Sequence, residues 1–248
     1  INTDPLLGPL QYNGGTTKTM ALLTGSPAID AGDNASAPAT DQRGFSRSGT
    51  ADIGAYEFNS NAPTVDLDTG TGGVDYAFTF TEGDAATTIV DATVAVADLD
   101  DTTLVNVKLD TGGIVDGASE QLTIGDLTFA LNAADFTDAT VDIGGNTYTV
   151  NWVSATGIAT ITLNSGEMTI AQSQAVMLAT AYQHTDTNNP SGGNRTIDVR
   201  VNDGNVNSAV ATSTITVAPV NDAPTVDLDA VPVGNDYAFT FTEGDVAT

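Results

Sequence analysis

Acidic side chains follow several apolar stretches of the chain, at points where short strands are expected to end. They form three groups after strands and a fourth in a connector: Glu82 and Asp84 after YAFTFT, Asp98, Asp100 and Asp101 after TVAVA, Asp203 after IDVRV, and Asn221 with Asp222 before Pro224. Ca²⁺ takes about 6–8 oxygen ligands from carboxylates, amides and backbone carbonyls. The pattern therefore favours calcium sites at the ends of a β module, with ordinary turn chemistry as the alternative.

The elements that must position these acids are strands, because apolar residues alternate with polar ones in the segments between them. The alternation runs through YAFTFT (76–81), TLVNVKLD (103–110) and RTIDVRV (195–201). A period of two places one set of side chains in a core and the other in solvent. In an antiparallel sandwich, successive strands run in opposite directions, so Glu82 and Asp98 are expected at opposite ends.

Turn residues complete the predicted fold. Gly125-Asp126 and Gly144-Gly145-Asn146 each lie between two alternating segments and predict hairpins. Residues 169–182 fit a short helix with Thr169 as its N-cap. We expect an all-β, antiparallel sandwich of the cadherin-like or immunoglobulin-like kind, with one helical crossover.

A long internal repeat sets the domain boundaries. YAFTFTEGD at 76–84 returns unchanged at 237–245, and residues 63–87 match 224–248 at 19 of 25 positions. The sequence thus contains one whole module and the opening of another. The predicted units are a distinct segment at 1–58, a linker at 59–63, the module at 64–218, a second linker at 219–224, and the first strands of a second repeat at 225–248.

Composition excludes several partners and site types. Asp and Glu number 32 against 6 Lys and Arg, giving a formal net charge of −26, which opposes binding to nucleic acid phosphates. The absence of cysteine excludes disulfides and thiolate metal sites. No apolar run approaches the ~18 residues of a membrane span, so no membrane insertion is expected in this segment. The N-terminus lacks signal-peptide features, so any export signal is expected to lie outside this sequence.

No catalytic group is predicted. His184 is the single histidine and has no cysteine nearby, so a role as general base or transition-metal ligand is not favoured. Trp152 shares a strand with Tyr148 and is expected in the core rather than on a sugar platform. The charged residues that mimic an enzyme cleft are read instead as turn or ion-pair residues: Asp30, Asp33, Asp41, Arg43 and Asp52.

Residues 61–248 resemble a cadherin-like repeat of very large bacterial surface proteins. The resemblance is carried by TIDVRVNDGNVNSAVATSTITVAPVNDAPTV, by a Glu that ends the first strand, and by Asp-x-Asp after the second. It implies that Glu82 and Asp186 face the C-terminal junction with Asn221 and Asp222, and that Asp98, Asp100 and Asp203 face the N-terminal one. The first linker has Ser60 and Asn61 at the corresponding positions, which implies a weaker or absent cation there. The full set of candidate metal ligands is Glu82, Asp84, Asp98, Asp100, Asp101, Asp186, Asp203, Asn221, Asp222 and Glu243.

Residues 1–58 resemble a different family. DPLLGPLQYNGGTTKTMALLTGSPAIDAGD, followed by TDQRGFSRSGTADIGAYEF, is similar to the closing segment of right-handed parallel β-helix surface proteins of the pectate-lyase-like, choice-of-anchor type. A solenoid segment of this length cannot bury its face without neighbouring rungs, so it is expected to pack on further rungs or on another surface.

These features predict a non-enzymatic segment of an extracellular bacterial surface protein. Its tandem β-sandwich repeats would be stiffened by Ca²⁺ at their junctions, with neighbouring repeats, copies of itself, or cell-surface glycans and proteins as partners. One alternative is a self-assembling filament subunit whose strands at 225–248 complete a neighbouring subunit. A further alternative is a β-helix protein that binds or cleaves polysaccharides.

Overall fold

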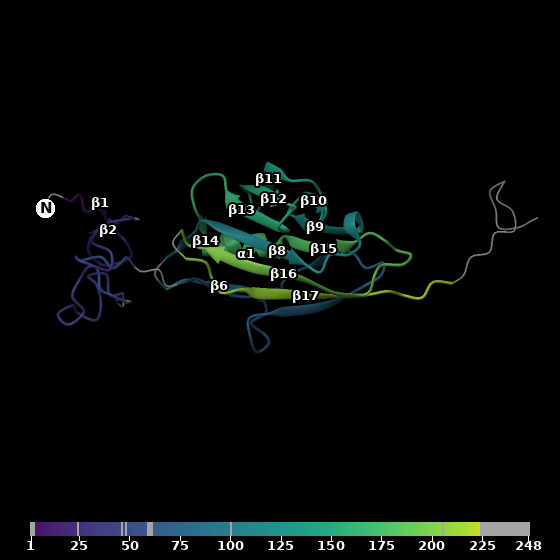
Figure 1. Ribbon diagram of the computed structural model, residues 1–248, viewed down its shortest axis with the longest axis horizontal. Coiled ribbons are helices and arrows are strands. Elements are labelled where there is room, and N and C mark those ends of the chain that lie inside the picture. Colours follow the sequence, from purple (N-terminus) through teal and green to yellow (C-terminus); the bar gives the residue numbers. More distant parts are fainter. Residues whose placement is uncertain are drawn as a thin grey trace, which may run out of the picture.

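The computed structural model describes residues 3–23, 25–45, 47, 49–58, 62–99, 101–204 and 206–223 (Figure 1). Most of its regular elements are strands, so the chain is all-β. The residues predicted to open a second repeat (225–248), together with the candidate ligands Asp100 and Glu243, lie outside the described residues.

The largest sheet has seven strands. Its order is β11 (Phe136–Ile143), β12 (Asn146–Val153), β13 (Ile158–Leu163), β8 (Asn106–Gly112), β16 (Gly193–Asn202), β17 (Ala211–Ala218) and β4 (Tyr76–Thr81). All neighbours are antiparallel except β17 and β4, which are parallel. This parallel pair at one edge departs from the purely antiparallel arrangement that the sequence predicted.

A four-stranded sheet and three strand pairs complete the fold. The four-stranded sheet is β10 (Leu127–Ala130), β9 (Glu120–Ile124), β15 (Thr180–His184) and β5 (Thr87–Thr88). The pairs are β1 (Leu7–Gln11) with β2 (Thr19–Leu22), β3 (Thr64–Asp66) with β6 (Ala95–Ala97), and β7 (Thr103–Leu104) with β14 (Met168–Thr169). Helix α1 (Ile170–Leu178) and the 3₁₀ turn η1 (Gly117–Ser119) are the helical elements among the described residues.

One hydrophobic core includes side chains of both larger sheets and of the shorter strands and helix α1. Phe80 of β4 meets Tyr182 of β15 edge-to-face with ring centroids 5.5 Å apart, and Phe129 of β10 meets Trp152 of β12 at 5.1 Å. Trp152 is fully buried and donates from Nε1 to the carbonyl oxygen of Ala133 at 3.1 Å. Its assignment to the core is confirmed, and the indole N–H has the partner that a buried tryptophan requires.

Both predicted hairpins and the strands at 76–81 and 195–201 are confirmed. The strand expected over 103–110 is instead divided at Val105 into β7 and β8, because β7 pairs with β14 outside the seven-stranded sheet. Ile124 pairs with Leu127 across the first hairpin, and Ile143 pairs with Asn146 across the second. The apolar residues that share one face of strands β8 and β16 are buried: Val107, Leu109, Ile197, Val199 and Val201. Local alternation and turn chemistry were therefore sufficient to define these elements.

The helix is shorter than the sequence predicted. It begins with a reciprocal capping box, in which Thr169 Oγ1 accepts from Gln172 N while Gln172 Oε1 accepts from Thr169 N. It ends at Leu178, whereas 169–182 was expected. Thr180–His184 forms β15 instead, because Thr180, Tyr182 and His184 alternate into the core and pair with β9.

Residues 3–58 form a separate group of loops around the β1–β2 ladder. The buried apolar side chains here are few, namely Leu22, Ala28 and Ala51. Buried charged and polar side chains fill much of the remaining interior: Thr19, Ser26, Asp41, Asp52 and Glu57. Hydrogen bonds and ion pairs therefore stabilise this segment more than apolar packing does.

Candidate metal centre

Three aspartates from two strand ends meet at one end of the sheets. Asp98 and Asp101 follow β6, and Asp203 follows β16; one carboxylate oxygen from each lies within 4.8 Å of the others. Asp98 Oδ1 accepts from the backbone N–H of Asp101 at 3.2 Å, and Asp203 Oδ1 accepts from Val206 N at 2.6 Å. Backbone hydrogen bonds thus fix the loops that carry the carboxylates.

Negative charge is concentrated in this cluster. Burial, followed by the charges of Asp98, Asp203 and Glu167, raises the pKa of Asp101 to about 6. The Arg43 guanidinium acts in the opposite direction but does not outweigh them. A group of carboxylates that resists losing its protons in this way would be stabilised by a cation.

The cluster borders the N-terminal segment. Asp101 and Thr103 line a pocket of about 320 Å³ together with Tyr12, Arg43 and Tyr56. A cation held by the aspartates would therefore lie next to residues of the 1–58 segment.

The other predicted acids lie at the opposite end, as expected from strand direction. β17 runs antiparallel to β16, and Glu82 follows β4, which is parallel to β17. Glu82 Oε2 accepts from the N–H of Val220 in the connector at 2.8 Å, while Glu82 N donates to the carbonyl oxygen of Ala218. Glu82 is therefore a direct contact of the predicted C-terminal linker.

The remaining candidate ligands are engaged locally. Asp84 Oδ2 accepts from Thr81 N at 2.7 Å, and Asp186 Oδ1 accepts from the backbone N–H groups of Asn188 and Asn189. Asn221 Nδ2 donates to the carbonyl oxygen of Asp222. Among the described residues, Glu82, Asp84, Asp186 and Asp222 join no group of three acidic or histidine side chains close enough to share an ion.

A second charged cluster, not predicted from the sequence, lies between the two larger sheets. Asp116, Glu120 and His184 bring ligand atoms within 4.8 Å, but Arg195 already occupies the group. Arg195 Nε donates to Glu120 Oε1 at 2.7 Å and Nη2 donates to Asp116 Oδ2 at 3.3 Å, while His184 Nε2 lies 2.9 Å from Asp116 Oδ2. A guanidinium thus supplies the positive charge that a metal would otherwise bring.

The sequence does carry a signal for this cluster. Glu120 lies two residues before Leu122, and Arg195 lies two residues before Ile197, so each charged side chain is on the core-facing side of its strand. A charged residue at such a position requires a buried partner of opposite charge.

The charged residues of the N-terminal segment bind one another and the backbone. Arg43 Nε donates to Asp41 Oδ2 at 2.7 Å, and its guanidinium carbon lies 3.7 Å from the ring centroid of Tyr56. Although burial opposes ionisation, hydrogen bonds from Glu57 N and Arg43 lower the pKa of Asp41. Arg47 forms an ion pair with Glu57. The interpretation of Arg43 as a buried ion-pair residue is confirmed.

Two aspartates hold neighbouring loops of the same segment. Asp52 accepts from the N–H groups of Asp30 and Phe58, and burial raises its pKa. Asp33 accepts from Ala35 N and from Ser36 Oγ. These carboxylates thus hold the backbone of neighbouring loops in place.

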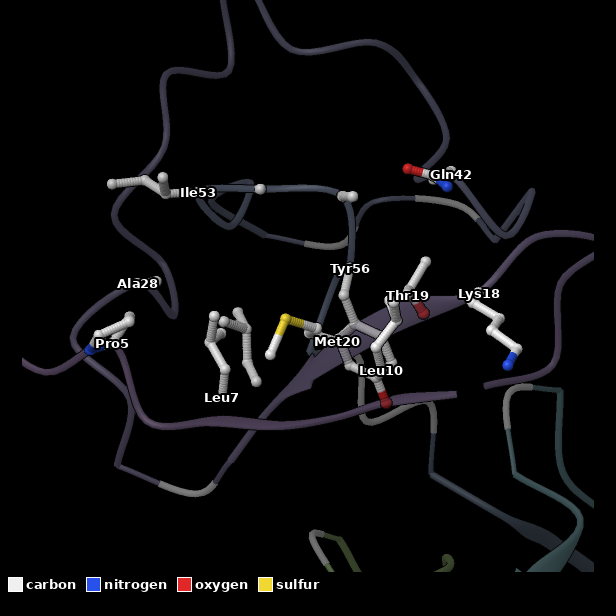
Figure 2. Close-up of a pocket in the computed structure, with 13 residues that line it drawn as sticks. Pro5, Leu7, Leu10, Lys18, Thr19, Met20, Ala28, Gln42, Ile53 and Tyr56 are labelled. Carbon is white, nitrogen blue, oxygen red and sulfur yellow. The ribbon is translucent and has the colours of Figure 1, made fainter. Parts of the chain in front are cut away.

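An apolar hollow of about 410 Å³ opens on the N-terminal segment (Figure 2). Leu7, Leu10 and Met20 of the β1–β2 ladder line it with Ile53 and Tyr56. Leu10 and Ile53 are 60% and 58% exposed, so much apolar surface here faces solvent.

Comparison with known proteins gives no matching family model, no similar curated protein and no similar solved structure. No helix among the described residues is long and apolar enough to cross a membrane.

Proposed function

We propose that residues 64–218 form a calcium-binding, cadherin-like β-sandwich repeat in the extracellular part of a bacterial surface protein. The ion stiffens the junction between this repeat and its neighbour, and the role is structural and adhesive rather than catalytic. The observation that carries the proposal is the convergence of Asp98, Asp101 and Asp203 beside the N-terminal segment.

The ligand chemistry favours Ca²⁺. The cluster offers carboxylate oxygens, whereas Zn²⁺ and Cu²⁺ are usually held by imidazole or thiolate groups. Three carboxylates supply as many as about six oxygens, and backbone carbonyls or water complete a flexible shell of the kind that Ca²⁺ accepts. The raised pKa of Asp101 supports the same assignment, because a divalent cation relieves the repulsion that raises it.

The sandwich assignment is supported by the packing of the two larger sheets. Aromatic contacts join them at Phe80–Tyr182 and at Phe129–Trp152, and their core is continuous. The resemblance of residues 61–248 to a cadherin-like repeat supports the same assignment, and under it neighbouring repeats, copies of the chain, and surface glycans or proteins are the expected partners.

The apolar hollow on the N-terminal segment supports its assignment to the end of a β-helix. A terminal coil of a solenoid has an apolar face that the adjacent coil covers. Leu7, Leu10 and Ile53 present such a face. The β-helix segment would then join the calcium-bound repeat to an upstream solenoid.

Calcium titration of the EDTA-stripped 248-residue protein tests the proposal, with Mg²⁺ and Zn²⁺ as comparison ions. We expect calorimetric heat for at least one Ca²⁺ site and a narrower range of end-to-end distances in small-angle X-ray scattering. Absence of heat together with unchanged scattering would contradict the calcium assignment.

A further inference from the structure

Within the described part of the chain, strand β4 has one edge that pairs with no other strand. It is the last strand of the seven-stranded sheet and pairs with β17 on one side, through register partners that include Thr79 with Thr216. Open strand edges present backbone groups that pair readily with another strand.

Backbone direction identifies the groups on that edge. Glu82 N donates to Ala218 toward β17, so the N–H groups of Phe80 and Phe78, two and four residues earlier, point the same way. The N–H groups of Thr81, Thr79 and Ala77 then point outward. Thr81 N is taken by Asp84 Oδ2 at 2.7 Å, whereas no hydrogen bond within the described part of the chain involves the outward N–H of Ala77 or Thr79.

The composition of β4 suits strand addition. Its six residues YAFTFT carry no charge, proline or glycine, and alternate aromatic with small side chains. Phe80 is buried, but Tyr76 and Phe78 are only partly buried and lie near each other, with ring centroids 5.7 Å apart. Short uncharged segments of this kind form tight homotypic ladders.

The chain contains a second copy of the sequence of this strand. Residues 237–242 read YAFTFT, and all six differences between 63–87 and 224–248 fall at positions that are exposed in the first copy: 69, 70, 71, 72, 74 and 85. The buried residues Pro63, Val65, Leu67 and Phe80 are identical to their counterparts. The second copy thus keeps the apolar face of β4 intact.

We propose that the open edge of β4 binds residues 237–242 of another copy of this chain, parallel and in register. Thr240 then lies beside Thr79 and extends the row of polar side chains Asn194, Thr216 and Thr79, in which Thr216 Oγ1 already contacts Asn194 Oδ1 at 3.1 Å. Tyr237 and Phe239 lie beside Tyr76 and Phe78 and cover their exposed surface.

The contact joins two different parts of the chain, residues 237–242 of one molecule and the edge of β4 of the next. It is therefore head-to-tail and generates open chains of molecules. The net charge of −26 opposes association, and salt is expected to strengthen it by screening. Asp84, by capping Thr81 N, limits the ladder at one end and favours this register over one shifted toward Glu82.

Paired charges at positions 79 and 240 test the proposal in the full 248-residue protein. Thr79→Lys with Thr240→Glu places opposite charges side by side, whereas Thr79→Lys with Thr240→Lys places like charges there. We expect the Lys/Lys protein to associate about tenfold more weakly than the Lys/Glu protein in sedimentation velocity at 0.15 M salt. EDTA is present throughout, so the outcome is independent of calcium binding.

The control is Thr216→Lys with Thr240→Lys, because Thr216 is exposed on the same face but lies one strand inward. It should associate like the protein with Thr240→Lys alone. If the Lys/Lys and Lys/Glu proteins associate equally strongly, positions 79 and 240 do not lie side by side, and the proposed register is wrong. A wild-type protein that stays monomeric at high concentration overturns the contact, as does a closed dimer that is insensitive to position 240.

Discussion

Arg195 and Glu120 form a buried ion pair that joins the two larger sheets. Arg195 lies on β16 of the seven-stranded sheet and Glu120 on β9 of the four-stranded sheet, with 2.6 Å between Nη2 and Oε1. Both side chains are at least 98% buried. Such a pair costs free energy to desolvate, but losing one partner costs more, because the other charge remains buried alone.

Replacing one member of this pair should destabilise the protein strongly. We expect Arg195→Met to lower the free energy of unfolding by about 3–5 kcal/mol, measured by urea denaturation. The double variant Glu120→Leu with Arg195→Met should lose less than Arg195→Met alone. Arg200→Met is the matched control, because Arg200 lies on the opposite face of β16. If Arg195→Met and Arg200→Met lower the free energy of unfolding equally, the buried ion pair does not stabilise the contact between the sheets.

Asp101→Asn should have two opposite effects: it relieves charge repulsion in the calcium-free cluster, and it removes a ligand for Ca²⁺. In EDTA at pH 7 the substitution removes a charge that burial and neighbouring carboxylates disfavour, so we expect unfolding free energy to rise by about 1–3 kcal/mol. The stabilisation that Ca²⁺ gives the wild type should be lost. Thermal unfolding with and without Ca²⁺ measures both effects, with Asp126→Asn in the exposed β9–β10 turn as control. A variant that Ca²⁺ still stabilises fully would remove Asp101 from the site.

The pH dependence should have opposite signs with and without calcium. The folded-state pKa of Asp101, about 6, lies above the ordinary value of 3.8, so the folded protein binds this proton more tightly than the unfolded chain does. In EDTA, the resulting stability is present below pH 4 and is lost as the pH rises through about 6. Ca²⁺ binding requires the ionised carboxylate, so affinity should increase over the same range with release of about one proton. Calorimetry in buffers of different ionisation enthalpy measures that release, and none at pH 5.5 would contradict the assignment.

Arg43→Lys should loosen the N-terminal segment without unfolding the sheets. Lysine keeps the charge but cannot both stack on Tyr56 and fill the donor positions toward Asp41 and the Glu57 carbonyl oxygen. We expect hydrogen exchange at residues 41–58 to accelerate by about tenfold, corresponding to about 1.4 kcal/mol of local stability. Exchange in β12 and β16 should stay unchanged. Lys18→Arg, at an exposed position of the same segment, serves as control.

Local rules predicted the elements whose residues interact with near neighbours. Alternation located β4, β8 and β16, and Gly125-Asp126 and Gly144-Gly145 located two hairpins, because these signals act over a few residues. Strand direction also placed Glu82 and Asp98 at opposite ends. The grouping of Asp98 with Asp203, 105 positions apart in the sequence, was implied by the cadherin-like resemblance and not by any local rule.

Tertiary packing decided the features that local rules missed. The end of α1 at Leu178 depends on the pairing of Thr180–His184 with β9, which a helical pattern at 169–182 does not reveal. The parallel pairing of β4 with β17 joins segments 137 positions apart. Predicting the Arg195 cluster would have required knowing that side chains of β9 and β16, which belong to different sheets, meet in the folded chain.

The parallel pairing of β4 with β17 also determines how the module bears mechanical load. Tension along the polypeptide pulls β4 from its N-terminal side and β17 from its C-terminal side, so neighbouring strands are drawn in opposite directions along their length. This is shear, in which the register pairs from Ser213–Tyr76 to Ala218–Thr81 are loaded together rather than one after another. The contact of Glu82 with Val220 lies at the end of that ladder, where the connector leaves the sheet. A module arranged in this way resists stretching until the whole ladder fails.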